Sequence, residues 1–119
     1  MNQEQLYAAL SREASLPEVQ KYIQKVIQLR GFGDQSTQAS LLLLLEEVGE
    51  LAKAVRKNTK GMSVDNSRIS NYDTIESEVA DVLIVLISIC NSLGIDLFDA
   101  LKEKERVNCE RTWRINNKS

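Results

Sequence analysis

The stretch IESEVADVLIVLISICNSL, residues 75–93, decides the fold. Val82 to Ile87 is an unbroken run of apolar residues, so a helix built from this stretch has almost no polar face in its second half. A helix that is apolar all round is buried on every side, which one small helical bundle cannot easily achieve. We therefore expect an all-α bundle whose central helix also packs against another subunit.

The remaining segments also predict helices and no strand. Apolar residues from Val19 to Ile27 recur at i, i+3, i+4, i+7 and i+8, which is the pattern of one amphipathic helix. The first expected helix runs from Gln3 to Glu13, and the second starts at Ser15 and Pro17 and ends at Gly31 and Gly33. The third runs from a cap at Thr37 to about Lys57. The fourth runs from a capping box of Asp73 and Glu76 to Leu93, and the fifth from a cap at Asp96 to about Trp113. These four or five helices form a single domain over residues 1–119, with an N-terminal extension at 1–15, a polar loop at 58–73 and a frayed tail at 114–119.

Composition and charge exclude several classes of protein. The 119 residues carry 15 basic and 17 acidic side chains and no histidine. The net charge of −2 argues against a duplex nucleic acid as partner, and the lack of histidine excludes the catalytic triads and zinc sites that depend on it. Cys90 and Cys109 are too few for a thiolate zinc site and suit a reducing compartment. The first 15 residues lack the apolar core of a signal peptide, and Val79 to Cys90 is too short to span a bilayer, so we expect a cytoplasmic protein without a membrane partner.

Two groups of acidic residues stand out. In LEEVGEL, residues 45–51, Glu46, Glu47 and Glu50 are spaced i, i+3 and i+4, so their carboxylates can point toward one volume. In the stretch above, Glu78 and Asp81 are spaced i, i+3, and an apolar run follows Asp81. A carboxylate buried in such surroundings costs several kcal/mol unless it is paired or bound to a metal.

An antiparallel return between these two helices would place the five carboxylates across one groove. Oxygen ligands without histidine favour Mg²⁺, with Mn²⁺ as a second choice, over zinc. Magnesium is usually bound through a few carboxylates together with substrate phosphates, so the pattern indicates metal-assisted phosphate chemistry. Each group taken singly is more often a solvated helix face, and it is their combination that favours a metal site.

The motifs EEVGE (46–50) and EVAD (78–81) resemble the EExxE…ExxD pattern of the MazG-like, all-α nucleoside triphosphate pyrophosphohydrolases. The resemblance extends from about Val19 to Trp113 and includes Arg30-Gly31-Phe32, where many members have a tryptophan in the third place, and the C-terminal residues Lys104, Asn108 and Arg111. It implies a homo-oligomer, a dimer or tetramer, that cleaves a nucleoside triphosphate between the α and β phosphates in a house-cleaning role. The implied metal ligands are Glu46, Glu47, Glu50, Glu78 and Asp81.

The roles of the other polar residues follow from this reaction. A carboxylate that the metal does not fully occupy could orient the attacking water as a base, and we favour Glu47. Substrate phosphates need cations and donors, for which Lys53 on the acidic helix and Lys104, Asn108 and Arg111 on the last helix are candidates. Two alternatives remain open: a non-catalytic helical oligomerisation or regulatory module, and a phosphoribosyl-ATP pyrophosphohydrolase.

Overall fold

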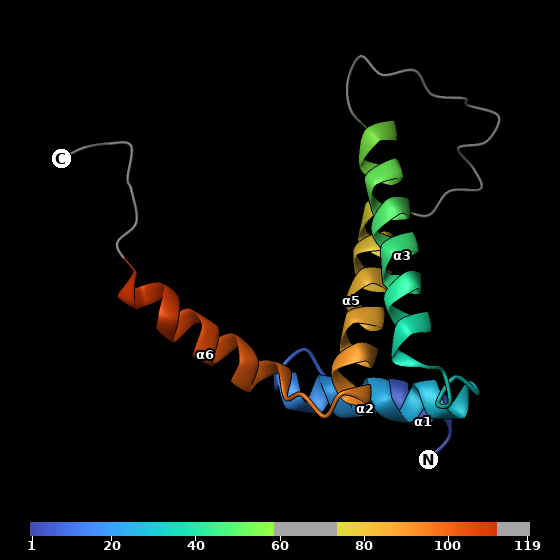
Figure 1. Ribbon diagram of the computed structural model, residues 1–119. Coiled ribbons are helices and arrows are strands. Elements are labelled where there is room, and N and C mark those ends of the chain that lie inside the picture. Colours follow the sequence, from blue (N-terminus) through green and yellow to red (C-terminus); the bar gives the residue numbers. More distant parts are fainter. Residues whose placement is uncertain (59–73, 112–119) are drawn as a thin grey trace.

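The computed structural model describes residues 1–58 and 74–111. Within these two ranges the chain forms five helices and no strand: α1 (Gln3–Ala9), α2 (Leu16–Leu29), α3 (Thr37–Lys57), α5 (Ile75–Ser92) and α6 (Leu97–Glu110) (Figure 1). The prediction of an all-α fold is confirmed. The predicted tail at 114–119, Trp113 and all of the predicted loop except Asn58 lie outside the described residues.

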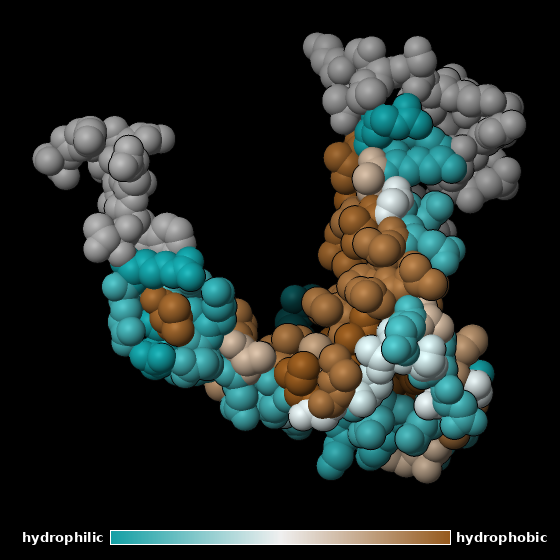
Figure 2. Space-filling view, in the orientation of Figure 1, coloured by the Kyte–Doolittle hydropathy of each residue, from teal (hydrophilic) through white to brown (hydrophobic). Residues whose placement is uncertain are grey.

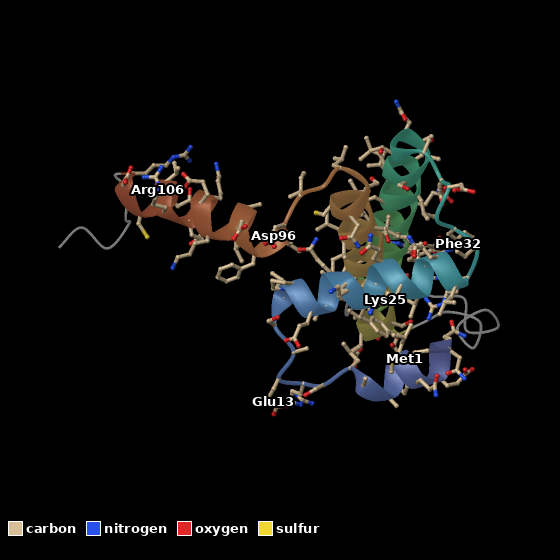
Figure 3. The ribbon with its side chains drawn as sticks, turned by 90° about the horizontal axis from the view of Figure 1, so that it is seen from below. Met1, Glu13, Lys25, Phe32, Asp96 and Arg106 are labelled. Atoms are coloured by element: carbon tan, nitrogen blue, oxygen red, sulfur yellow. The ribbon has the colours of Figure 1, made fainter. Side chains whose placement is uncertain are left out.

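An antiparallel pair of long helices dominates the arrangement. α3 and α5 lie side by side, and the end formed by the start of α3 and the end of α5 meets α2, against which α5 packs (Figure 1). α1 packs on α2 and buries Leu6, so part of the predicted N-terminal extension belongs to the folded body. α6 packs against α2 at its beginning and then extends away from the α3–α5 pair, as the view from below shows between Asp96 and Arg106 (Figure 3).

The start of α2 is where the sequence placed it. The hydroxyl of Ser15 accepts a hydrogen bond from the backbone N–H of Glu18 (3.2 Å), and the Glu18 carboxylate accepts one from the backbone N–H of Ser15 (2.8 Å). The pKa of the Glu18 carboxyl is lowered, mainly by the hydrogen bond to the Ser15 backbone and secondly by hydrogen bonding to the Ser15 side chain. A lowered folded-state pKa stabilises α2 above the unfolded pKa, and this contribution is lost as the pH falls through the folded pKa.

Four other helix ends differ from the predictions. α1 ends at Ala9 rather than Glu13, because Leu10 is extended and its N–H bonds to Tyr7. Ser36, not Thr37, caps α3, since its hydroxyl reaches the N–H of Ala39 at 3.1 Å. Thr74 caps α5 through the N–H of Ser77 (3.1 Å) in place of the predicted box, whose Asp73 lies outside the described residues. α6 ends at Glu110 because Arg111 is extended.

Two helices end in left-handed glycines. Gly31 (φ +86°) follows α2, where Phe32 N–H bonds to Ile27 O at 3.0 Å and Gly31 N–H bonds to Gln28 O at 3.1 Å. Gly94 (φ +69°) follows α5 with the equivalent bonds from Ile95 to Cys90 (2.9 Å) and from Gly94 to Asn91 (3.3 Å). Both are Schellman motifs, which turn the chain sharply and satisfy carbonyls at the helix end. The ends of α2 and α5 predicted at these glycines are confirmed.

Gly31→Ala should therefore lower the free energy of unfolding by about 1–2 kcal/mol, because a Cβ disfavours the left-handed conformation. No heavy atom lies within 4 Å of the position this Cβ would take, so the loss would come from the backbone conformation and not from a clash. Gly49→Ala is the matched control, since Gly49 lies inside α3 with open space around it and the change should stabilise the helix by about 0.5–1 kcal/mol. Chemical denaturation of both variants measures the difference in the free energy of unfolding. Equal effects would contradict the left-handed conformation assigned to Gly31.

One side of the α3–α5 pair is apolar and exposed. On α3 it consists of Leu41, Leu45, Val48 and Val55, and on α5 of Val79, Leu83 and Leu86. Successive residues of each set are three, four or seven positions apart, so each set forms one stripe along its helix. In Figure 2 a continuous hydrophobic surface covers this pair of helices. We call these seven residues the apolar seam; because of it, a single copy does not bury α5 on every side.

The apolar character of α5 raises the question of a membrane span. In the described part of the chain no single helix is long and apolar enough to cross a bilayer. Among the described helices, only α5 and α6 taken together, which are bent by 97° relative to each other, have the length and composition of a membrane-spanning segment.

Candidate metal and nucleotide site

Three carboxylates come together between α3 and α5. One oxygen each of Glu47, Glu78 and Asp81 lies within 4.8 Å of the other two. Glu78 is 6% exposed, and Glu47 and Asp81 are half-buried. Since neighbouring carboxylates at such distances are costly to bury without a cation, this cluster is the structural candidate for the predicted metal site.

The rotation of α3 about its axis decides which acids enter the cluster. The stripe of α3 that faces α5 contains Leu43, Glu47, Leu51 and the buried Ala54, at spacings of four and three residues. Glu47 lies in the middle of this stripe. Glu46 and Glu50 lie on the neighbouring face with Lys53, and both carboxylates are exposed. Of the five predicted ligands, the structure therefore unites three, while Glu46 and Glu50 lie beside the cluster.

The donor set fits a hard divalent cation. Three carboxylates from two antiparallel helices offer oxygen ligands only, which Mg²⁺ and Mn²⁺ accept and zinc does not favour. Glu47, Glu78 and Asp81 would hold the ion and leave further positions to water and to substrate phosphates.

The predicted phosphate-binding residues lie at two places. Lys53 is half-buried on α3, two turns from Glu46. On α6, Lys104 and Asn108 continue the stripe that begins with Leu97 and Leu101, and Arg111 is the C-cap of this helix. Because α6 extends away from the α3–α5 pair, this stripe does not line the acid cluster of its own chain (Figure 1).

The opposite face of α6 carries an ion-pair network. Arg106 contacts Glu103 and Glu110, each at 2.7 Å, with side chains that are more than half exposed. The bond to Glu103, foremost, raises the pKa of Arg106. Exposed pairs of this kind contribute little to stability, so they describe the solvent side of α6 rather than a site.

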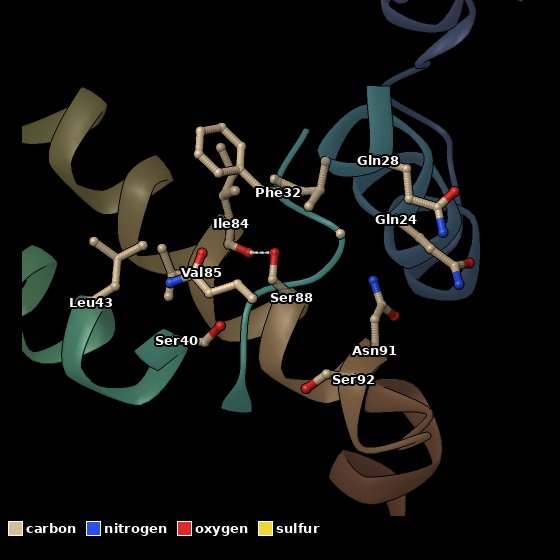
Figure 4. Close-up of a pocket in the computed structure, with 13 residues that line it drawn as sticks. Gln24, Gln28, Phe32, Ser40, Leu43, Ile84, Val85, Ser88, Asn91 and Ser92 are labelled. Atoms are coloured by element: carbon tan, nitrogen blue, oxygen red, sulfur yellow. Dashed lines mark hydrogen bonds between the residues drawn. The ribbon is translucent and has the colours of Figure 1, made fainter. Parts of the chain in front are cut away.

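A cavity of about 420 Å³ opens where α2, α3 and α5 meet. Its wall is made of neutral amides, hydroxyls and apolar side chains, and Figure 4 shows amides from α2 opposite Ile84 and Val85 of α5. The lining residues are Gln24, Ile27, Gln28, Phe32, Gly33, Gln35, Ser40, Leu43, Ile84, Val85, Ser88, Asn91 and Ser92. No charged residue is among them, so the cavity suits a neutral, partly polar group better than a phosphate.

The cavity and the acid cluster share one side of the helix pair. Leu43 precedes Glu47 by one turn on α3, and Ile84 and Val85 follow Asp81 by one turn on α5. A ligand that fills the cavity can therefore extend along the two helices toward the carboxylates. The apolar seam occupies other faces of the same helices, so the site and the seam do not compete for space.

Sequence reasoning missed most of this cavity. Gln24, Gln28, Ser88 and Asn91 were not recognised as site residues, because isolated amides and hydroxyls on amphipathic helices are common on solvated faces. Phe32 attracted notice only through the Arg-Gly-Phe motif, and the Schellman turn at Gly31 places its ring at the cavity. The usable signal was the interruption of the apolar α5 by Ser88 and Asn91 at helical spacing.

Fold and site together define an all-α protein with a cluster of three carboxylates between two antiparallel helices. Residues 35–108 match the model of the MazG nucleotide pyrophosphohydrolase domain, and the chain belongs to this family. The match covers α3, α5 and most of α6, and so includes all three clustered carboxylates.

Two similar proteins agree with this assignment. A dATP/dGTP diphosphohydrolase from Cyanophage S-2L is 31% identical over 80 residues, which cover 67% of this chain and 61% of that protein. The crystal structure of YPJD from Bacillus subtilis, described as a putative pyrophosphatase, superposes with a TM-score of 0.62 at 28% identity, covering 86% of this chain and all of the other.

Proposed function

We propose that the protein is a Mg²⁺-dependent nucleoside triphosphate pyrophosphohydrolase that releases pyrophosphate and a nucleoside monophosphate. The observation that carries this proposal is the cluster of Glu47, Glu78 and Asp81 in a chain of the MazG family. A bound divalent ion would neutralise phosphate charge and make a water molecule more acidic. Glu47 is the proposed base that orients this water, and Glu46 and Glu50 remain proposed ligands beside the cluster.

We further propose that the cavity holds the nucleoside. Amides can pair with the edge of a base, and the ring of Phe32 can stack on it. The relative named for dATP and dGTP makes purine deoxynucleotides the first substrates to test. A house-cleaning role in a reducing cytoplasm, which the two free cysteines would suit, stays part of the proposal.

The active form is proposed to be a homo-oligomer. The seven exposed residues of the seam would become buried if the α3–α5 pairs of two copies packed into a four-helix bundle. In such an assembly the stripe of Lys104, Asn108 and Arg111 on the outstretched α6 would be available to the phosphates at a second copy, while Lys53 would serve those of its own chain.

A substrate panel in H₂¹⁸O tests the function. The purified full chain with Mg²⁺ should convert dATP or dGTP to the monophosphate and pyrophosphate, with one ¹⁸O atom incorporated per cleavage. EDTA should stop the reaction and Mn²⁺ should restore it. The panel includes the four ribonucleotides, modified nucleotides and phosphoribosyl-ATP.

The products discriminate the alternatives. Release of inorganic phosphate, or no turnover of any nucleotide, would refute the proposed reaction, and the second result would favour a non-catalytic module. Preference for phosphoribosyl-ATP over every nucleoside triphosphate would move the protein to that activity with the same carboxylates.

A further inference from the structure

Gln20 of α2 is buried at the junction of three segments. Gln20 and Glu78 are the two polar residues of the described ranges that are more than nine-tenths buried, with 7% and 6% of their surface exposed. Glu78 belongs to the acid cluster, whereas Gln20 belongs to no site described so far. A buried amide is costly unless all of its polar atoms are satisfied, so its partners show what it holds together.

Four hydrogen bonds connect Gln20 to α5, to the turn after α5 and to α6. The side-chain nitrogen Nε2 donates to Oδ1 of Asn91 (3.1 Å) and to the carbonyl of Ile95 (3.0 Å). The oxygen Oε1 accepts from the backbone N–H of Leu97 at 2.6 Å, and the backbone carbonyl of Gln20 accepts from Nδ2 of Asn91 at 3.1 Å. The amide side chain of Gln20 is thus satisfied at both ends.

Backbone groups fix the orientation of both amides. If the Gln20 amide were reversed, two donors would face each other at Leu97 and two acceptors at Ile95. If the Asn91 amide were reversed, its oxygen would face the Gln20 carbonyl. The network therefore has one arrangement, and removing the Gln20 side-chain amide would take away the partners of Asn91 Oδ1 and of the first N–H of α6 together, while Asn91 Nδ2 keeps its bond to the Gln20 carbonyl.

The two groups that would lose their partner, Asn91 Oδ1 and the Leu97 N–H, belong to two parts of the proposed site. Asn91 lines the cavity, and Leu97 is the first residue of α6, whose N–H has no partner within its own helix. The direction in which α6 leaves the body depends on this junction, since α6 packs against α2 and then extends freely (Figure 3).

We propose that Gln20 is a positioning residue, which holds Asn91 in the cavity wall and sets the direction of α6. The inference rests on the proposed function, in which the cavity receives the nucleoside and α6 supplies phosphate-binding groups. Gln20 itself does not line the cavity and is not one of the proposed phosphate-binding groups. Its loss would weaken substrate binding while the acid cluster, which lies along α3 and α5 away from α2, keeps its geometry.

Kinetics of Gln20→Met give the first test, because methionine has a similar length and no amide. KM for the preferred nucleotide should rise about 10-fold, the equivalent of one or two lost hydrogen bonds, while kcat changes less than about 3-fold. The dissociation constant for Mn²⁺ should stay unchanged. Lys21→Met is the control, since Lys21 is the exposed neighbour on α2 and makes none of these bonds.

A double-mutant cycle tests whether the effect passes through Asn91. Asn91→Leu and the double variant are measured beside Gln20→Met. If Gln20 acts partly through Asn91, the double variant raises KM by clearly less than the product of the single effects. Independent effects would overturn this half of the proposal.

The direction of α6 has a readout that needs no turnover. One nitroxide is attached to Cys109, which is exposed on α6, and a second to Gln38→Cys at the exposed start of α3, with buried Cys90 replaced by alanine. Labelled chains are diluted into unlabelled ones so that pulsed EPR reports distances within one chain. We expect a narrow distance distribution in the parent and a broad one after Gln20→Met.

The outcomes separate the two proposals. An unchanged distribution, or a broadened one with an unchanged KM, would overturn the positioning role of Gln20. Absence of turnover in the parent protein would refute the proposed function, while the EPR distributions would still decide whether Gln20 sets the direction of α6.

Discussion

Glu78→Gln should lower kcat/KM for Mg²⁺-dependent release of pyrophosphate by at least about 1000-fold, because it removes a proposed anionic metal ligand from the acid cluster. Glutamine keeps the size of the side chain but not the charge that would bind the cation. Glu78 is 6% exposed, so no water can easily replace the lost ligand. Steady-state kinetics with dATP, and Mn²⁺ binding by EPR, measure the two effects.

Glu76→Gln is the matched control for this prediction. Glu76 lies in the same first turn of α5 but is exposed and is not part of the cluster, so its loss should change kcat/KM less than about 2-fold. Asp81→Asn should behave like Glu78→Gln. A Glu78→Gln variant that is folded by circular dichroism and retains more than a tenth of the activity would refute the assigned metal site.

The second large effect concerns the apolar seam. Wild-type protein should sediment with at least twice the 13.4 kDa of one chain, and Leu45→Glu with Leu83→Glu should lower its association constant at least 1000-fold. The physical reason is the cost of roughly 4 kcal/mol or more of burying two added carboxylates from each copy in an apolar interface. Leu45 and Leu83 are 62% and 45% exposed within one chain, so the substitutions need not disturb the fold of the single copy.

Tyr7→Glu serves as the control for the seam. Tyr7 is 69% exposed on α1, outside the seam, and its replacement should leave the sedimentation coefficient unchanged. A wild-type protein that sediments as a monomer at micromolar concentration would contradict the proposed assembly. Dissociation by Tyr7→Glu to the same extent would show that the interface lies elsewhere.

The helices could be predicted from the sequence because residues close to each helix end form its cap. Ser15 with Glu18 and Asp96 with Asp99 are cap pairs within three residues, and Gly31 and Gly94 supply the left-handed turns. The remaining errors are of one to four residues, where two capping residues stand next to each other, as with Ser36 and Thr37, or where an extended residue ends the helix early. Local sequence does not decide between adjacent caps of similar strength.

The face of α3 that packs against α5 could not be predicted from the sequence. Five consecutive leucines, Leu41 to Leu45, precede the acids and make the helix apolar on all sides. Spacing therefore allowed Glu46, Glu47 and Glu50 equally, and only packing against α5 turns the stripe of Leu43, Glu47 and Ala54 inward. That Glu78 and Asp81 lie together could be predicted, because they are spaced i, i+3 on a helix whose neighbouring positions are mostly apolar.

Gln20 shows the third kind of limit. Its place on the apolar face of α2, three residues before Ile23, is a visible signal for a buried amide. Its partners are 71 to 77 residues away in the chain, however, and one of them is a backbone N–H. Contacts of this range and kind have no pattern within a single sequence.

The exposed seam also bears on how activity scales with the amount of protein. In the proposed assembly a second copy would pack on α3, the helix that also carries Glu47, so assembly would be coupled to the carboxylate geometry through one helix. By mass action, dilution below the dissociation constant of the proposed oligomer would convert it into single copies and would then lower the rate per chain. A modest rise in expression around that concentration would then give a more than proportional rise in nucleotide hydrolysis.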